Sequence, residues 1–288
     1  MIASRLQATL NVQPRAVQLD SPEASQQILV FDATDDGRQH DLTRDIEFKF
    51  STPDVARIDR YGVLRPVAMG ETQLIVNPGN QQLVVPVRVS ELSDPRKVSF
   101  RHDVIPVVSR SGCNAGGCHG KATGQNGFKL SVFGSDPAAD YHAMVREGIG
   151  RRISIVDPDK SLLLLKGTAG IAHSGGTRFN ADDDRARLLR RWITEGAELD
   201  TDPESALVMT ENRVEPAHIT VWPGECQQLR VSEIHQSVAV RCVTVLAQYA
   251  SNSDMVATVN ERGLITSKDI PGEARSWCGI SIMSLFAV

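Results

Sequence analysis

Between residues 113 and 119 the chain reads Cys-Asn-Ala-Gly-Gly-Cys-His, and these residue types can do more chemistry than any other segment. Two thiols can add across the vinyl groups of a haem while a histidine next to them binds the iron, usually at the spacing C-x-x-C-H. Here four residues separate Cys113 from Cys118, and the small residues Ala115, Gly116 and Gly117 let the longer loop bulge. The segment predicts one covalent haem c at Cys113 and Cys118, with His119 as an iron ligand.

Three other chemistries fit the same residues and stay open at this point. A structural zinc site needs a fourth ligand, commonly from a second paired motif, and only scattered candidates exist here. A disulfide between Cys113 and Cys118 is sterically reasonable in an exported protein. A redox-active pair normally has the spacing C-x-x-C.

Helices are expected to position this motif, within a segment that spans residues 98–200. The residues DVIPVVSRSG place Val104, Ile105, Val107 and Val108 on one side of a helix that follows Asp103. Near the other end, ADDDRARLLRRWITEGA predicts a helix over 183–196, with acidic residues at its start and Gly196 at its end.

On both sides of this segment the hydrophobic pattern is that of strands. Apolar residues alternate from about 8 to 92 and again from 217, in short runs bounded by Pro, Gly, Asp and Asn. The string STPDVARIDRYGVL (51–64) matches SNSDMVATVNERGLI (251–265), and LNVQPRAVQL (10–19) matches ITVWPGECQQL (219–229). This repeat indicates that one β unit was duplicated around an insert, with Asp54 equivalent to Asp254 and Gly62 to Gly263.

The repeated string resembles the bacterial immunoglobulin-like group 2 (BIG2) domain, over 8–92 and, incompletely, over 217–288. The words P-x-x-S-x-L and L-x-x-W-I-x-x-G-A, with the cysteine motif before them, resemble the planctomycete-type cytochrome c domain over 98–200. The two resemblances imply a multidomain chain, in which an all-α cytochrome c-like haem domain is inserted between two β-sandwich domains.

The cytochrome resemblance also implies a sixth iron ligand after the P-x-x-S-x-L helix, where such domains commonly carry a methionine. This chain has Ala172-His173-Ser174-Gly175-Gly176 at that place, so His173 is the expected ligand opposite His119. His142 and Met144 are the other candidates, and a loop histidine bonded to backbone is the other interpretation of His173.

Arginines can pair with the haem propionates, because a guanidinium matches a carboxylate with two hydrogen bonds. Arg178 is the expected cofactor-binding arginine, with Arg152 as a second candidate. Phe128 and Trp192 are expected in the core, where they also wall the haem.

Composition limits the partners. A net charge of −4 lacks the basic surface of a nucleic-acid-binding protein. No window approaches 18 uninterrupted apolar residues, so no transmembrane helix is expected. The N-terminus lacks the apolar run of a secretory signal, yet haem attachment to cysteine and the two resemblances imply an extracytoplasmic location, periplasmic or at the cell surface.

The C-terminus departs from the repeat. After about residue 275 the sequence RSWCGISIMSLFAV lacks the alternation found in the first unit, and a frameshift near 275 is one explanation. The second β-sandwich is therefore expected to be truncated, without its final strands.

The function that follows is an extracytoplasmic c-type haem-binding electron-transfer protein with an unknown redox partner, more an electron carrier than an enzyme. The alternative is a haem-free cell-surface adhesion or spacer protein with Cys113 and Cys118 as a disulfide. A zinc-stabilised binding module is the third possibility.

Overall fold

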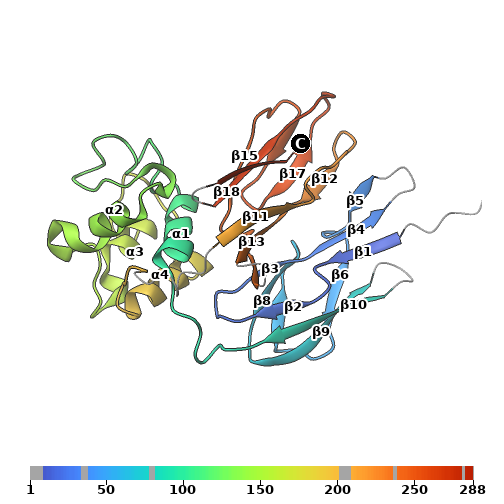
Figure 1. Ribbon diagram of the computed structural model, residues 1–288, viewed down its shortest axis with the longest axis horizontal. Coiled ribbons are helices and arrows are strands. Elements are labelled where there is room, and N and C mark those ends of the chain that lie inside the picture. Colours follow the sequence, from blue (N-terminus) through green and yellow to red (C-terminus); the bar gives the residue numbers. More distant parts are fainter. Residues whose placement is uncertain are drawn as a thin grey trace, which may run out of the picture.

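The fold is described from a computed structural model, which covers residues 9–33, 38–77, 82–200, 209–235, 239–280 and 283–287 (Figure 1). Strands occupy both ends of this part of the chain, and helices and turns occupy the middle. The domain bounds 8–92, 98–200 and 217–288 stay a prediction, and residue 8 lies outside the described residues.

The first β unit consists of three small sheets around its own hydrophobic core. Strands alternate because their side chains point to opposite faces, and Val85, Val87 and Val89 are buried while Val84 and Arg88 are exposed. The sheets are β1 (Thr9–Gln13), β4 (Leu29–Ala33) and β5 (Gln39–Asp41); β2 (Val17–Leu19), β10 (Leu83–Val89), β9 (Gly70–Asn77) and β6 (Glu47–Phe50); and β3 (Gln26–Gln27), β8 (Val63–Pro66) and β7 (Ala56–Ile58).

The second β unit repeats much of this layout. Its sheets are β11 (Met209–Glu215), β13 (Arg230–His235) and β14 (Ala239–Cys242); β12 (Cys226–Gln228), β17 (Leu264–Ser267) and β16 (Ala257–Val259); and β15 (Gln248–Ser251), β18 (Ser276–Ile280) and β19 (Met283–Ala287). The described residues after 275 thus form two strands, and β18 pairs with β15 as β9 pairs with β6.

Hydrogen bonds establish the duplication, at an offset of 201 residues between Gln27 and Val67 of the first unit and their equivalents in the second. The Ile28 amide donates to Gly62 O, and the Leu229 amide donates to Gly263 O, each at 2.8 Å. The predicted equivalence of Gly62 and Gly263 therefore agrees with the structure, and both have positive φ (79° and 75°), the region where a side chain would be strained.

Two details of the predicted alignment are wrong. Val55 O accepts from the Val67 amide and Val256 O from the Lys268 amide, so the same offset pairs Asp54 with Met255 and not with Asp254. Strand β1, which the sequence match places opposite 219–229, instead corresponds to β11, because β1 is the outer partner of β4 as β11 is of β13.

The middle segment does not form the expected all-α cytochrome c-like domain, and that fold class is wrong for this chain. The described chain is mostly strands in small sheets, and only α4 among the described α-helices exceeds six residues. The helices are α1 (Ile105–Arg110), α2 (Pro137–Tyr141), α3 (Leu162–Gly167) and α4 (Asp184–Thr194), with π turns η1 (Phe100–Val104) and η3 (His142–Arg146) and 3₁₀ turns η2 (Val132–Gly134), η4 (Glu147–Gly150) and η5 (Pro158–Lys160).

Residues with positive φ are the physical reason why these helices are short. Phe133, Gly148 and Ile149 adopt left-handed conformations within the 3₁₀ turns, and Asn126 and Gly127 do so in the loop before them. A left-handed residue stops helical propagation in an L-peptide. The interspersed glycines and asparagines therefore leave connected turns where a longer helix would otherwise form.

The closing helix α4 agrees with its prediction. The Asp183 carboxylate accepts a hydrogen bond from the Ala186 amide at 3.0 Å, which satisfies an open N–H group of the first turn. Leu188, Leu189, Trp192 and Ile193 are buried, with Trp192 only 1% exposed. Leu189 also reaches the pocket described below.

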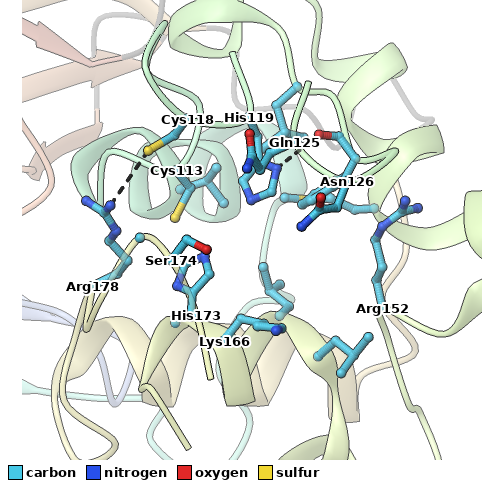
Figure 2. A pocket seen from close by; sticks show the side chains of 18 of the residues that line it. Cys113, Cys118, His119, Gln125, Asn126, Arg152, Lys166, His173, Ser174 and Arg178 are labelled. Carbon is cyan, nitrogen blue, oxygen red and sulfur yellow. Dashed lines mark hydrogen bonds between the residues drawn. The ribbon is translucent and has the colours of Figure 1, made fainter. Parts of the chain in front are cut away.

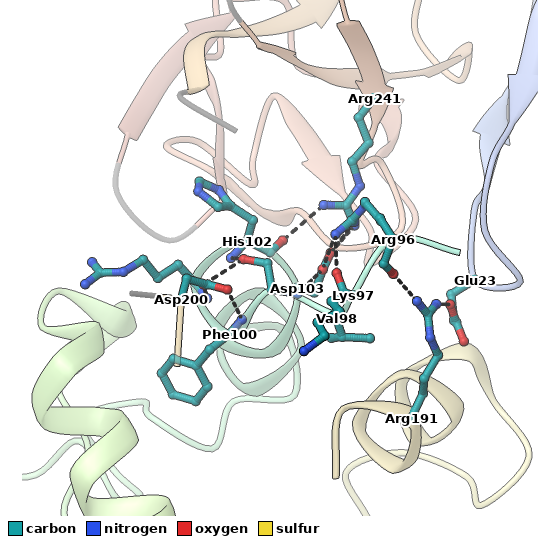
Figure 3. A network of polar contacts seen from close by, with 12 residues as sticks. Glu23, Arg96, Lys97, Val98, Phe100, His102, Asp103, Arg191, Asp200 and Arg241 are labelled. Atoms are coloured by element: carbon teal, nitrogen blue, oxygen red, sulfur yellow. Dashed lines mark hydrogen bonds and ion pairs between the residues drawn. The ribbon is translucent and has the colours of Figure 1, made fainter. Parts of the chain in front are cut away.

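Charged contacts join the three parts of the chain. Arg65 on β8 donates to the Asp184 carboxylate of α4 at 2.7 Å, and Glu23 of the first unit pairs with Arg191 of α4. Asp103 accepts from Arg96 through both of its oxygens, at 2.8 and 2.9 Å, and pairs with Arg241 of the second unit (Figure 3). The middle segment and the second β unit also share one hydrophobic cluster.

Candidate functional site

A pocket of about 340 Å³ lies in the middle segment, within the range typical of small-molecule sites (Figure 2). Four stretches of this segment supply most of its lining: the loop after α1, the loop around 125–130, helix α3 and the loop that follows α3. The rest comes from Val108, Met144, Leu189 and residues 151–153. Its apolar wall consists of Val108, Phe128, Leu130, Met144, Ile153, Leu162, Leu163, Phe179 and Leu189. The pocket also brings together every site residue expected from the sequence, namely Cys113, Cys118, His119, His173 and Arg178.

His119 presents one ring nitrogen to this pocket. Its Nδ1 lies 3.0 Å from the carbonyl oxygen of Phe128, and a carbonyl can only accept, so Nδ1 carries the hydrogen. In the neutral ring Nε2 then holds the free lone pair. Burial lowers the pKa of His119, and the nearby His173, Arg152 and Arg178 lower it further, while the Phe128 hydrogen bond opposes the shift. The lowered pKa favours the neutral imidazole.

His173 repeats this arrangement from the other side of the pocket. Its Nδ1 lies 3.1 Å from the carbonyl oxygen of Gly176, which again leaves Nε2 as the lone-pair nitrogen. The two imidazole rings are parallel to within 9°, with 6.5 Å between their centroids (Figure 2). The loop hydrogen bond and the position facing His119, given as alternatives for His173 from the sequence, therefore occur together.

The two cysteines lie beside this pair as free thiols. Burial raises the pKa of Cys113 to about 11 even though Arg178 opposes the shift, so its thiol stays protonated at neutral pH. The Arg178 guanidinium donates to Cys118 Sγ at 3.6 Å. The disulfide considered from the sequence is absent from the described structure.

The other two candidate iron ligands, Met144 and His142, differ in their position relative to the pocket. Met144 is buried and lines the pocket. His142 is exposed and lies 3.5 Å from Glu147, outside the lining residues. Met144 is therefore the one sulfur or nitrogen donor from η3 that could replace His173.

Arg152 has a positioning role in this structure. Its guanidinium donates to Ala143 O at 2.7 Å and to Gly127 O at 2.8 Å, and it lies over the Phe128 ring at 4.5 Å. Because Phe128 O is the acceptor for His119, Arg152 supports the loop that orients that imidazole.

Four further polar residues line the pocket that the sequence did not single out: Gln125, Asn126, Arg151 and Lys166. They come from two loops and from α3, and no spacing in the sequence marks them as one group. The one local feature of the sequence that could have indicated this loop is Asn126-Gly127, a pair typical of a tight turn, and both residues have positive φ.

The two imidazoles are close enough to hold a metal between them. Two metal–nitrogen bonds of about 2 Å each would separate the bonded nitrogens by roughly 4 Å. The rings are stacked with 6.5 Å between their centroids, and since each lone pair lies in its ring plane, the imidazoles would turn their Nε2 atoms toward the metal on binding. The described residues contain no group of three or more His, Cys, Asp or Glu side chains that could hold a metal ion by themselves. The protein alone therefore supplies two neighbouring imidazoles and an apolar slot, which suits a metal that brings its other ligands with it.

Comparisons with known proteins assign no family. No family model matches the chain, and no curated protein matches it. The solved structures similar to it include domains 5–6 of the S-layer protein SbsC, at 11% identity and a TM-score of 0.35, covering 96% of this chain and 92% of that one. Domains 4–9 of the surface layer protein SbsC give 10% identity and a TM-score of 0.34, with 97% and 30% covered.

The expected membership in the planctomycete-type cytochrome c family, flanked by BIG2 domains, is therefore wrong by these comparisons. No family model and no curated protein of either kind matches the chain. The description as a cytochrome with an electron-transfer role likewise has no support. Among the described residues, no helix is long and apolar enough to cross a membrane.

Proposed function

We propose that the pocket in the middle segment binds one haem, with His119 and His173 as ligands on its two faces and thioether bonds to Cys113 and Cys118. The observation that carries this proposal is the pair of parallel imidazoles, 6.5 Å apart between centroids, each with Nδ1 bonded to a backbone carbonyl. A ligating histidine is commonly oriented by such a bond at its other nitrogen.

A porphyrin suits the pocket better than a bare ion. It supplies four metal ligands in a plane, so that two protein nitrogens complete the coordination. Its flat apolar body matches a slot walled by Phe128, Leu130, Met144 and Phe179. A bare transition ion would need further protein ligands, and the described residues offer no third donor as part of such a group.

The two thiols add covalent retention to this binding. Each Cys thiol adds across one vinyl group: the S–H bond and the π bond break, and one S–C and one C–H bond form. Atoms and electrons balance without an oxidant. The reaction uses the protonated thiol as a reactant, which is the form that burial favours for Cys113.

This proposal also implies where the protein is located. Thioether attachment of haem is expected outside the cytoplasm, so the protein would act in the periplasm or at the cell surface. The proposed function is haem binding, with the redox partner and any electron-transfer role outside it.

A structural role without haem is the second candidate: a spacer or adhesion module at a cell surface. Two observations favour it. The two β units make up much of the described chain and repeat one layout, and they contact one another through buried main-chain amides. In that case the middle segment would serve as a connector.

Production of the full chain with a haem-attachment system separates the two candidates. The proposal expects protein that stays red after denaturation and keeps its haem on a gel, whereas Cys226→Ser should not change this retention. Haem that extracts into acidic organic solvent would rule out covalent attachment. A protein that takes up no haem at all would favour the structural role.

A further inference from the structure

The pocket has an unbalanced set of charges. Its lining includes Arg151, Arg152, Lys166 and Arg178 but no aspartate or glutamate. Since a cation placed beside an apolar slot is stabilised by a nearby anion, this lining favours a ligand that is apolar in its body and negatively charged at an edge. The two carboxylates of a haem meet that description.

The cysteines decide which end of the pocket can receive those carboxylates. In protohaem the two vinyl groups and the two propionates lie on opposite edges of the ring. Cys113 and Cys118 therefore mark the vinyl edge, and Arg178 lies at that same edge, 3.6 Å from Cys118 Sγ. Figure 2 shows Arg178 and the cysteines on one side, with Gln125, Asn126 and Arg152 on the other.

We infer that the end of the pocket opposite the cysteines, where Asn126 and Arg151 line it, is the carboxylate-binding site of the ligand. This inference rests on the proposed haem binding and adds the orientation of the haem within the pocket. Arg152 is already engaged by Ala143 O and Gly127 O and stays a positioning residue for the loop. Lys166 likewise donates to Ala172 O, beside His173. Arg151, the next residue along the chain from Gly150, is exposed and also lines the pocket.

Arg178 then has a different part from the one expected from the sequence. At 3.6 Å from Cys118 Sγ and within reach of the Gly175 backbone, it holds the attachment loop against the loop of His173. Its predicted pairing with the propionates is the alternative to the site at Arg151, and one experiment distinguishes them.

The test uses the full chain with attached haem and measures the midpoint potential of the iron against pH. Protonation of a haem carboxylate produces an inflection in this profile. Because a neighbouring cation lowers a carboxylate pKa by about one to three pH units, Arg151→Gln should move the inflection upward by about one pH unit. Arg178→Gln, which removes the same charge from the cysteine end, should leave the inflection in place.

Glu147 needs its own control, because its carboxylate lies 4.0 Å from Arg152. Glu147→Gln should keep the inflection and so assign it to the haem. An inflection that moves with Arg178→Gln, or with none of these variants, would overturn the carboxylate site while haem binding stands. A wild-type protein without attached haem would overturn both.

Discussion

Cys242 in the second β unit occupies the position that Asp41 holds in the first, and each accepts a hydrogen bond from the other unit. The Gln228 amide donates to Asp41 Oδ2 at 2.6 Å, and the Gln27 amide donates to Cys242 Sγ at 3.3 Å. Gln27 and Gln228 are themselves equivalent at the offset of 201. The contact therefore repeats itself in both directions, as in a two-fold interface between identical subunits.

Removing the Asp41 carboxylate should destabilise this contact. Asp41→Ala leaves the buried Gln228 amide without its acceptor and also removes the 2.8 Å bond from the Thr43 amide. An unsatisfied buried donor costs about 1–3 kcal/mol, and urea denaturation should show a loss of that order. Asp45→Ala, on an exposed neighbour, is the matched control; an equal loss in both variants would contradict the role of the interface.

Acid should weaken the junction that Asp103 makes. The carboxyl is 1% exposed; burial opposes its ionisation, but Arg241 and Arg96 outweigh burial and hold its pKa well below the usual range. A depressed pKa gives stability that is present above the unfolded pKa of about 3.9 and is lost as pH falls below it. The free energy of unfolding should therefore decrease as pH drops from about 4.

Asp103→Asn tests this junction at neutral pH. Breaking a buried ion pair from one side costs about 3–5 kcal/mol, so the variant should be less stable at pH 7 and should change less between pH 7 and acid. The surface pair of Arg190 with Asp159 supplies the control, because an exposed pair contributes about 1 kcal/mol or less. A variant as stable as Asp159→Asn would show that the junction does not depend on Asp103.

A glycine beside His173 should control the position of that imidazole. A Cβ added at Gly175 would lie 2.8 Å from His173 Cε1 and 2.8 Å from Arg178 Nη2, which forces one of them to move. A Cβ at Gly116 would meet nothing within 4 Å. Gly175→Ala should therefore reduce the six-coordinate haem signal in the absorption spectrum, while Gly116→Ala should leave it unchanged.

The sixth ligand can be assigned from the spectrum of the reduced protein. His173→Ala should convert low-spin iron into high-spin iron, because the proposed ligand is lost from one face. His142→Ala should have no effect, since that side chain is exposed and outside the pocket. A low-spin signal that persists in His173→Ala would transfer the role to Met144, which is buried at the pocket wall.

Some of this structure follows from the sequence for local reasons. The cap at Asp183 and the buried face of α4 depend on neighbouring residues along one helix, so residue spacing was sufficient to predict them. His173 was placed opposite His119 by a resemblance that the comparisons do not uphold. The structure nevertheless places His173 beside His119, because the loop after α3 lines the same pocket.

Other features depend on contacts that spacing does not encode. The helices of the middle segment are short because Phe133 and Ile149 adopt left-handed conformations, which the hydrophobic pattern of the sequence does not predict. The alignment of the two repeats could be fixed only from their hydrogen bonds, because similar residues match at offsets of both 200 and 201. The pair of Arg65 and Asp184, 119 residues apart, arises from tertiary packing alone.

The most direct test of haem binding is the mass of the tryptic peptide that contains both cysteines. Cleavage after Arg110 and Lys121 releases residues 111–121, which include Cys113, Cys118 and His119. From protein made with a haem-attachment system, this peptide should carry the mass of one haem, and Cys113→Ser with Cys118→Ser should remove it. A peptide at its unmodified mass, or two hydrogens lighter as a disulfide, would contradict the proposed attachment.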